Sequence, residues 1–134
     1  MGGGRDRGGR EGDMWSYFQV NGVLNHNGSL VGVGYSGHPP HVNDPAAEGI
    51  ENSGPIPKGR WAIGEAYDDP VEGPVVMALT PAPETITFNR SAFRIHGDEV
   101  EHPGAELASH GCIILSRMIR MMIALSIDKD LEVV

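Results

Sequence analysis

The sequence predicts a small, mostly-β domain with one short helix close to its C-terminal end. The 19 Gly and 10 Pro among 134 residues interrupt the chain too often for long helices. Asn21-Gly22 and Asn27-Gly28 separate short, strand-like apolar segments, and Asn-Gly is the strongest short hairpin signal. Only one segment, from Ser116 to about Ser126, spaces its apolar residues as a helix does. We therefore expect one β domain, with no internal repeat and no second domain.

The chain divides into a tail, residues 1–13, and a domain, residues 14–134. The tail holds six Gly, three Arg and three acidic residues, with Met1 as its only apolar residue. Because such a segment has nothing to bury, we expect it to be disordered. It also lacks the apolar stretch of a secretory signal, so the sequence predicts synthesis in the cytoplasm without a signal peptide.

The first half of the domain reads as three strands and a long loop. The expected strands cover 15–20, 23–26 and 29–35, joined by the two Asn-Gly turns. Residues 36–59 are rich in Pro, Gly, Asn and His, which predicts a surface loop. This loop is either a lid over an active site or a plain connection.

The second half reads as short strands around the helix. The expected strands cover 61–67, 75–80, 86–88, 92–96 and 131–134. Ser116 is a suitable helix N-cap, and Met118, Ile119, Met122 and Leu125 follow helical spacing. We expect the methionines of this helix to fill the core.

Charge and composition exclude several classes of protein. The formal net charge is −8, with no basic stripe, so binding to nucleic acid or to an anionic membrane surface is not expected. The longest apolar runs, 75–79 and 121–125, are far shorter than the roughly 20 residues of a membrane span. Cys112 is the only cysteine, which rules out an intramolecular disulfide.

The most informative stretch runs from Phe93 to Leu115 and places Cys112 sixteen residues after His96. A thiol needs a neighbouring imidazole to take its proton, and that imidazole needs an acceptor on its other nitrogen. Gly111 allows a substrate close to the backbone. The Gly111 and Cys112 amides are candidates to face a developing oxyanion. The sequence therefore predicts a cysteine nucleophile with a histidine base, and no cofactor or metal.

These residues carry a resemblance to a known family. His-Gly-Asp followed at this distance by Ser-His-Gly-Cys-Ile resembles the catalytic signature of YkuD-like L,D-transpeptidases, enzymes of peptidoglycan chemistry. Further segments resemble the small branch of type VI secretion L,D-transpeptidase effectors. The matching segments are Gly34–Gly37, Asn52–Gly59, Phe93–Asp98 and Ser109–Leu115.

The resemblance implies a YkuD-like β-sandwich and an acyl transfer on peptidoglycan stem peptides. It implies that Cys112 attacks the carbonyl of the third residue and expels the terminal D-residue, with His96 as the base. It also implies that the Gly97 carbonyl orients His96 and that the Gly111 and Cys112 amides form the oxyanion hole. Resolution of the thioester by water gives an L,D-carboxypeptidase, and resolution by an amine gives a transpeptidase or D-amino-acid exchange. Other residues expected to shape the loop or bind substrate are Ser109, His110, Tyr35, Asp98 and Arg117.

The effector branch implies an antibacterial toxin that acts in the periplasm of a target bacterium. It implies a cognate immunity protein and a secretion-system component as partners.

Two other kinds of protein stay open at this point. The first is a zinc peptidase, in which ligands come from His96, His102, His110 and Cys112. The second is a β-domain that binds peptidoglycan or a partner without turnover. Thiol reactivity separates a nucleophile from a relic, because we expect a catalytic Cys112 to ionise below the roughly 8.5 of a free thiol.

Charged residues near the motif also have two interpretations. Glu99 and Glu101 belong to an acidic loop with Asp98 and Glu106, which either is solvated or meets an amino group of the substrate. Arg117 and Arg120 begin the helix and either are solvent-exposed or bind a substrate carboxylate.

Overall fold

A computed structural model describes residues 13–101 and 104–134. The predicted tail, apart from Asp13, lies outside the described residues, as does His102. The ten strands, in chain order, are β1 (Trp15–Tyr17), β2 (Val23–His26), β3 (Ser29–Val33), β4 (Tyr35–Ser36), β5 (Gly59–Ile63), β6 (Tyr67–Asp69), β7 (Gly73–Pro81), β8 (Arg94–His96), β9 (Ile113–Ile114) and β10 (Asp130–Val133). A short 3-10 helix, η1 (Pro45–Ala47), and one α-helix, α1 (Arg117–Leu125), complete the described elements.

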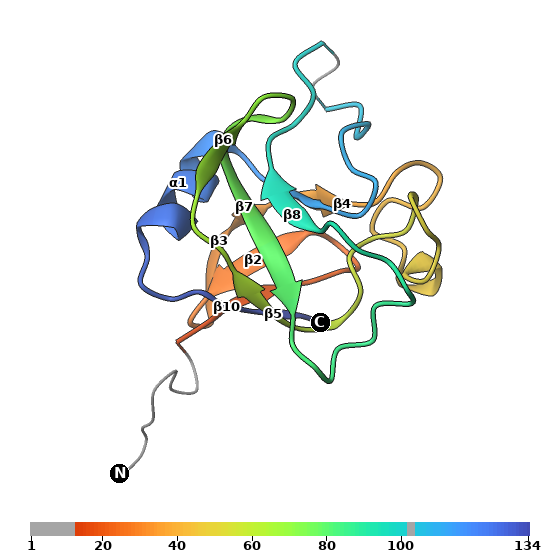
Figure 1. Ribbon diagram of the computed structural model, residues 1–134, viewed down its shortest axis with the longest axis horizontal. Helices are drawn as coiled ribbons and strands as arrows, with labels where there is room; N and C mark the ends of the chain where they lie inside the picture. Colours follow the sequence, from red (N-terminus) through yellow and green to blue (C-terminus); the bar gives the residue numbers. More distant parts are fainter. Residues whose placement is uncertain (1–12, 102–103) are drawn as a thin grey trace.

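The strands form one continuous sheet that curls back on itself. Their order is β3-β2-β1-β10-β5-β7-β8-β9-β4, with β6 paired to β7 (Figure 1). The two ends of this order, β3 and β4, are consecutive in the chain and are separated by Gly34 alone. The two halves of the sheet therefore face each other across one core, and the prediction of a mostly-β domain with one short helix is confirmed.

The core joins apolar side chains from both halves. Trp15, Tyr17 and Leu24 of β1 and β2 pack in one cluster with Ile95 and Ile113 of β8 and β9. All of these side chains are buried. Each large apolar side chain stabilises the fold by roughly 1.5–3 kcal/mol through its burial. This cluster anchors β8 and β9, the two strands that lead to the site.

The two Asn-Gly turns behave differently. Asn27 and Gly28 have φ values of 50° and 84°, as the predicted type I′ turn between β2 and β3 requires. The first turn is longer, because the Phe18 amide donates to the Val23 carbonyl (2.8 Å). Gln19 points inward, where its Nε2 donates to the Ile56 carbonyl (2.9 Å), so β1 ends earlier than the expected residue 20.

Gly34 turns the chain from one end of the sheet to the other. Its amide donates to the Gly22 carbonyl (2.8 Å). A Cβ at Gly34 would lie 2.0 Å from the Ile114 carbonyl oxygen, so no larger residue fits. The strand expected over 29–35 is therefore divided into β3 and β4, and β4 pairs with β9.

The prediction of a strand over 86–88 is wrong. Phe88 and Asn89 have φ values of 57° and 59°, outside the strand region. The Arg90 amide donates to the Thr87 carbonyl (3.0 Å), which closes a turn where the sequence predicts an extended chain. The strand expected over 61–67 is also divided, into β5 and β6.

The helix has the predicted ends but presents a different face to the core. The Ser116 hydroxyl accepts from the Ile119 amide (3.3 Å), as expected of an N-cap. Met118 and Met122, however, are 76% and 47% exposed, so the expectation that they fill the core is wrong. Ile123 and Arg120 point inward instead. The Arg120 guanidinium donates to the Pro74 carbonyl (2.7 Å), and this contact fixes the rotation of the helix.

Within residues 13–101 and 104–134, no helix has the length and apolar character needed to cross a bilayer.

Candidate active site

A cavity of about 390 Å³ lies at the ends of β8 and β9. His96 and Arg94 line it from β8, and Cys112 and Gly111 line it from the loop before β9. The structure thus places the predicted nucleophile and base at one cavity. A carboxylate that the sequence did not suggest, Glu72, also lines this cavity.

The pairing of β8 with β9 explains how two residues far apart in the chain meet. The strands run parallel, with Ile95 opposite Ile113 and His96 opposite Ile114. In this register Cys112, one residue before β9, lies level with Arg94. Arg94 and His96 are two residues apart on β8, so both side chains leave the same face of the strand.

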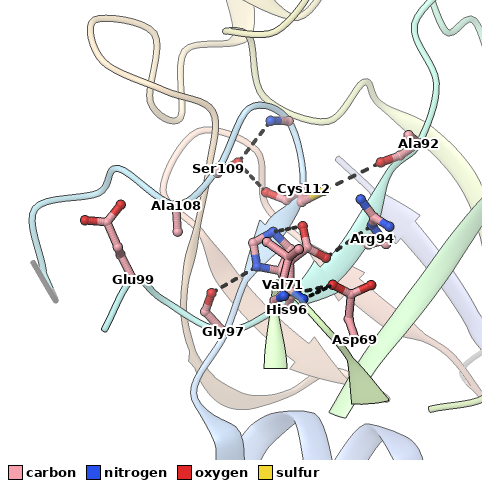
Figure 2. Close-up of polar contacts among 12 residues, drawn as sticks. Asp69, Val71, Ala92, Arg94, His96, Gly97, Glu99, Ala108, Ser109 and Cys112 are labelled. Atoms are coloured by element: carbon pink, nitrogen blue, oxygen red, sulfur yellow. Dashed lines mark hydrogen bonds and ion pairs between the residues drawn. The ribbon is translucent and has the colours of Figure 1, made fainter. Parts of the chain in front are cut away.

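Both nitrogens of His96 have acceptors. Nδ1 lies 3.0 Å from the Gly97 carbonyl oxygen, which is the contact that the resemblance implies. Nε2 lies 3.4 Å from a carboxylate oxygen of Glu72. Figure 2 shows His96 between Gly97 and the cavity. The side chain is buried, so its orientation is held by the strand and by these two contacts.

The Cys112 thiol does not contact His96 directly in the described structure. Its Sγ lies 3.7 Å from the Ala92 carbonyl oxygen, to which the thiol donates (Figure 2). Both side chains open onto the same cavity.

Burial favours the neutral forms of both groups. It raises the pKa of the Cys112 thiol, although Arg94 opposes this shift through its backbone amide and its guanidinium. Burial also lowers the pKa of His96, against the opposing effect of Glu72 and of the Gly97 carbonyl. The direction for Cys112 is opposite to the lowered pKa expected of a preformed thiolate, because the thiol lies in a desolvated cavity. Burial thus disfavours the charged form of each group, while Glu72 and Arg94 oppose that effect.

Ser109 organises the loop that carries Cys112. Its hydroxyl oxygen accepts from the Gly111 amide (3.0 Å) and the Gly37 amide (2.9 Å). The hydroxyl donates to the Cys112 carbonyl (2.6 Å), and Figure 2 shows it beside that residue. The Gly111 amide is therefore bonded within the loop, so of the two amides expected at the oxyanion only that of Cys112 stays a candidate.

Gly111 has a conformation that favours glycine. Its φ is 139°, and a Cβ there would lie 2.5 Å from an Arg90 guanidinium nitrogen. A larger residue at this position would displace the loop from Arg90.

The long loop over residues 37–58 packs against the site loop. The ring of His38 stacks on that of His110, with 4.7 Å between ring centroids. His110 Nδ1 lies 3.1 Å from the Asn52 carbonyl oxygen. These contacts hold His110 between the two loops, at the wall of the cavity that Cys112 and His96 also line.

Arg90 joins the long loop to the loop that carries Cys112. Its guanidinium donates to the carbonyls of Pro55 (2.8 Å), Gly54 (2.8 Å) and His110 (3.3 Å), and also to that of Glu48. Arg90 is buried. The long loop is thus fixed to the site loop through Arg90, which a plain connection would not be.

Tyr35 and Asp98 hold the acidic loop together. The Tyr35 hydroxyl donates to Asp98 (2.8 Å) and accepts from the Ala108 amide (3.1 Å). Burial opposes ionisation of Asp98, but hydrogen bonds from the Gly104 amide and from Tyr35 outweigh it and lower the pKa of this carboxyl. Asp98 is therefore an anion committed to backbone and hydroxyl donors of its own loop.

A second cavity, of about 490 Å³, lies on the other side of His96. Arg117, Asp98 and Glu99 contribute to its lining. Arg117 is solvent-exposed, whereas Arg120 is buried and bonds backbone carbonyls. For Arg120 both sequence interpretations are wrong, since it is neither on the surface nor free for a substrate.

Comparison with known families decides what this chain is. The sequence profile of the Tlde1 domain matches residues 32–133. The chain belongs to the Tlde1 domain family. This is the family of type VI secretion L,D-transpeptidase effectors that the sequence resembles.

Two further comparisons were made for this Tlde1 domain. No curated protein matches it. A solved structure, "L,D-transpeptidase from Mycobacterium smegmatis", is similar with a TM-score of 0.48 and 15% sequence identity. The match covers 90% of this chain and 58% of the other. The Tlde1 domain thus spans little more than half the length of that protein.

Among residues 13–101 and 104–134, no three His, Cys, Asp or Glu side chains lie together as a metal site would require. His102, one of the ligands considered, lies outside the described residues.

Sequence reasoning missed three charged residues of this site. The alternation of a strand would have placed Arg94 beside His96. Arg90 carries no sequence signal, because its partners are backbone carbonyls. Glu72 sits between Pro70 and Gly73 in a tight turn, and only the tertiary structure brings it to His96.

Proposed function

We propose that this Tlde1 domain is a cysteine acyltransferase that acts on peptidoglycan stem peptides. The observation that supports this most is the parallel β8–β9 register, which brings Cys112 and His96 to one cavity. Membership of the effector family supports peptidoglycan as the substrate.

The reaction begins with transfer of the thiol proton from Cys112 to Nε2 of His96. The thiolate attacks the carbonyl carbon of the third stem residue, and the carbonyl π electrons move to oxygen. The Cys112 amide is the proposed donor to this oxyanion. His96 is the proposed general base for this attack.

Collapse of the tetrahedral intermediate breaks the peptide bond to the terminal D-residue. His96 returns its proton to the leaving amine, and a thioester to Cys112 stays behind. Water or an amine then attacks this thioester with His96 again as base. Water makes the reaction an L,D-carboxypeptidase, whereas an amine gives a crosslink or an exchanged D-amino acid.

The remaining predicted residues serve the site in different ways. Gly97 orients His96 through its carbonyl, and Ser109, Gly111 and His110 set the shape of the Cys112 loop. Tyr35 and Asp98 order the acidic loop at the second cavity. Arg117, exposed at that cavity, is proposed to bind a substrate carboxylate.

The family also supports a role outside the producing cell. We place the action of this domain in the periplasm of a target bacterium, after delivery by a type VI secretion system. A cognate immunity protein that covers the cavity would protect the producer.

The test is mass spectrometry of purified muropeptides incubated with the wild-type protein and with Cys112→Ala. We expect tetrapeptides to lose or exchange the terminal D-residue with the wild type only. The variant should lose at least about 1,000-fold in rate, as removal of a covalent nucleophile does. Unchanged muropeptides with folded, reduced wild type would contradict the proposal in favour of a binding domain. Activity that survives in Cys112→Ala would indicate a different chemistry, which metal analysis would identify.

A further inference from the structure

Glu72 is carried into the site by a stiff turn between β6 and β7. One carboxylate oxygen of Asp69 accepts from the backbone amides of Val71 (2.9 Å) and Glu72 (2.8 Å), and dashed lines lead to Asp69 in Figure 2. These bonds fix the direction in which Glu72 leaves the backbone. Its side chain is 20% exposed, so most of the carboxylate is removed from water.

The two oxygens of this carboxylate face two cationic or titratable partners. Oε2 lies 3.4 Å from His96 Nε2, and Oε1 lies 3.3 Å from Arg94 Nε. Oε1 and the Arg94 Nε atom are buried and have no hydrogen-bond partner in the described structure. The ion pair between Glu72 and Arg94 is therefore their principal compensation.

The protons on His96 decide whether its contact with Glu72 is attractive or repulsive. Nδ1 donates its proton to the Gly97 carbonyl, which has no proton of its own to give. In a neutral His96 the lone pair of Nε2 would then face the carboxylate of Glu72, and two acceptors would oppose each other. The contact is attractive only when a proton lies between Nε2 and Oε2.

We propose that Glu72 is a positioning residue that holds, through His96, the proton released by Cys112 until the leaving amine takes it. This inference rests on the proposed function and adds a third side chain to the proposed pair. It also assigns Arg94 the task of holding the Glu72 carboxylate beside His96.

The physical reason is the direction in which charge moves. Transfer of the thiol proton moves one positive charge from Sγ to Nε2, which is in direct contact with Glu72, whereas no hydrogen bond joins Glu72 to Cys112 in the described residues. The nearby anion therefore favours the protonated imidazole. It also raises the pKa of the Cys112 thiol, but its direct contact is with His96. Arg94 faces both the carboxylate and the thiol, so it also stabilises the thiolate left behind.

The proton balance of the step is closed. The S–H bond of Cys112 breaks, its electron pair stays on sulfur, and an N–H bond forms at Nε2 of His96. That proton is shared with Glu72 and then bonds to the nitrogen of the departing D-residue. Glu72 ends the cycle as the carboxylate with which it began.

The charged groups around His96 come from several elements. They are Glu72 of the β6–β7 turn, Asp69 of β6, Arg94 of β8, Asp98 after β8, Arg120 of α1 and the thiol of Cys112. Of these, only Glu72 contacts the imidazole through a carboxylate.

The experiment compares Glu72→Gln with wild type and with Glu132→Gln. Glu132 is a suitable control because it also pairs with an arginine, Arg60, but on the outer surface of β10 and β5. The imidazole of His96 is titrated by nitrogen-detected NMR, with His96→Gln to assign its signals. Turnover is measured in parallel on purified tetrapeptide muropeptides.

We expect the pKa of His96 to fall in Glu72→Gln and to stay at the wild-type value in Glu132→Gln. We also expect kcat of Glu72→Gln to fall roughly 10- to 100-fold, the worth of one hydrogen bond to a charged group, with KM almost unchanged. Glu72→Asp keeps the negative charge but moves it away from His96 by the length of one methylene. The pKa of His96 in this variant should therefore lie between the values in the wild type and in Glu72→Gln. This variant also decides the matter if Glu72→Gln does not fold.

An unchanged His96 pKa in a folded Glu72 variant would overturn the proposal, as would full kcat in Glu72→Gln. The titration does not depend on the substrate. A wild-type protein without turnover would therefore overturn the proposed function, while the NMR result would still decide whether Glu72 holds the His96 proton.

Discussion

The two halves of the curled sheet share one apolar core, but the half that carries the site also depends on buried arginines. The half formed by β1, β2 and β10 packs by apolar burial, with Trp15, Leu24 and Leu131 almost inaccessible to solvent. The half that carries the site is tied by polar side chains that bond backbone carbonyls, Arg90 beneath the two loops and Arg120 beneath β7. Apolar packing fixes the positions of the strands. Buried arginines that bond several backbone carbonyls, here called arginine clamps, fix the positions of the irregular loops.

The difference follows from what each half must position. Short strands satisfy their own backbone groups in ladders, whereas loops leave carbonyls that need donors when they are buried. A guanidinium has five N–H donors in a fixed plane, so one buried arginine can satisfy several carbonyls. The site half therefore has a precise shape without regular secondary structure.

The largest expected effect is that of Arg90→Met, which removes the clamp and keeps most of the side-chain volume. Four backbone carbonyls lose their donor, so we expect a loss of about 3–5 kcal/mol in unfolding free energy and at least about 100-fold in turnover. Chemical denaturation and the muropeptide assay measure the two. Arg60→Met is the control, since Arg60 is 55% exposed in its ion pair and should change stability by under about 1 kcal/mol. Normal turnover in Arg90→Met would show that the loops hold their shape without the clamp.

The next effect in size is that of Leu24→Ala in the apolar half. Leu24 is fully buried, so we expect the unfolding free energy to fall by about 2–5 kcal/mol. The kcat of the folded protein should stay within about twofold of wild type, because the clamped loops are untouched. Denaturation curves and turnover at a temperature below the unfolding transition test this separation. A fall in kcat as large as that of Arg90→Met would remove the distinction between the halves.

The smallest effect is expected on the outer face of α1. Met118 and Met122 are exposed, so Met118→Ser with Met122→Ser should change the unfolding free energy by under about 1 kcal/mol. Ile123→Ala on the inner face of the same helix should cost about 2–5 kcal/mol. Thermal unfolding of both variants measures the contrast. Equal losses would mean that the helix buries the methionines in solution.

Local signals made part of this fold predictable. Asn27-Gly28 specifies its turn by positive φ values, and Ser116 marks the helix start by its own hydrogen bond. The His96 and Cys112 motif likewise needs no tertiary knowledge to suggest its chemistry. The turn and the helix start depend only on residues close in the chain, whereas the motif is a sequence pattern that spans sixteen residues.

The errors arose where tertiary contacts decide between local alternatives. The helix has two apolar stripes, and the reach of Arg120 to the Pro74 carbonyl selects the stripe of Ile123 over that of the methionines. Around Phe88 the chain turns with positive φ despite a strand-like composition. Glu72 approaches His96 from a turn more than twenty residues earlier, and no local pattern records such a meeting.

The pairing of β1 with β10 has a mechanical consequence. The two strands are parallel, with Trp15 opposite Leu131 and Tyr17 opposite Val133. A force that pulls the chain at residue 15 away from the chain at residue 133 therefore loads this pair along the strand axis. The ladder bonds must then yield together rather than one after another. The first contact to resist such stretching is thus the one that joins the first strand of the chain to the last.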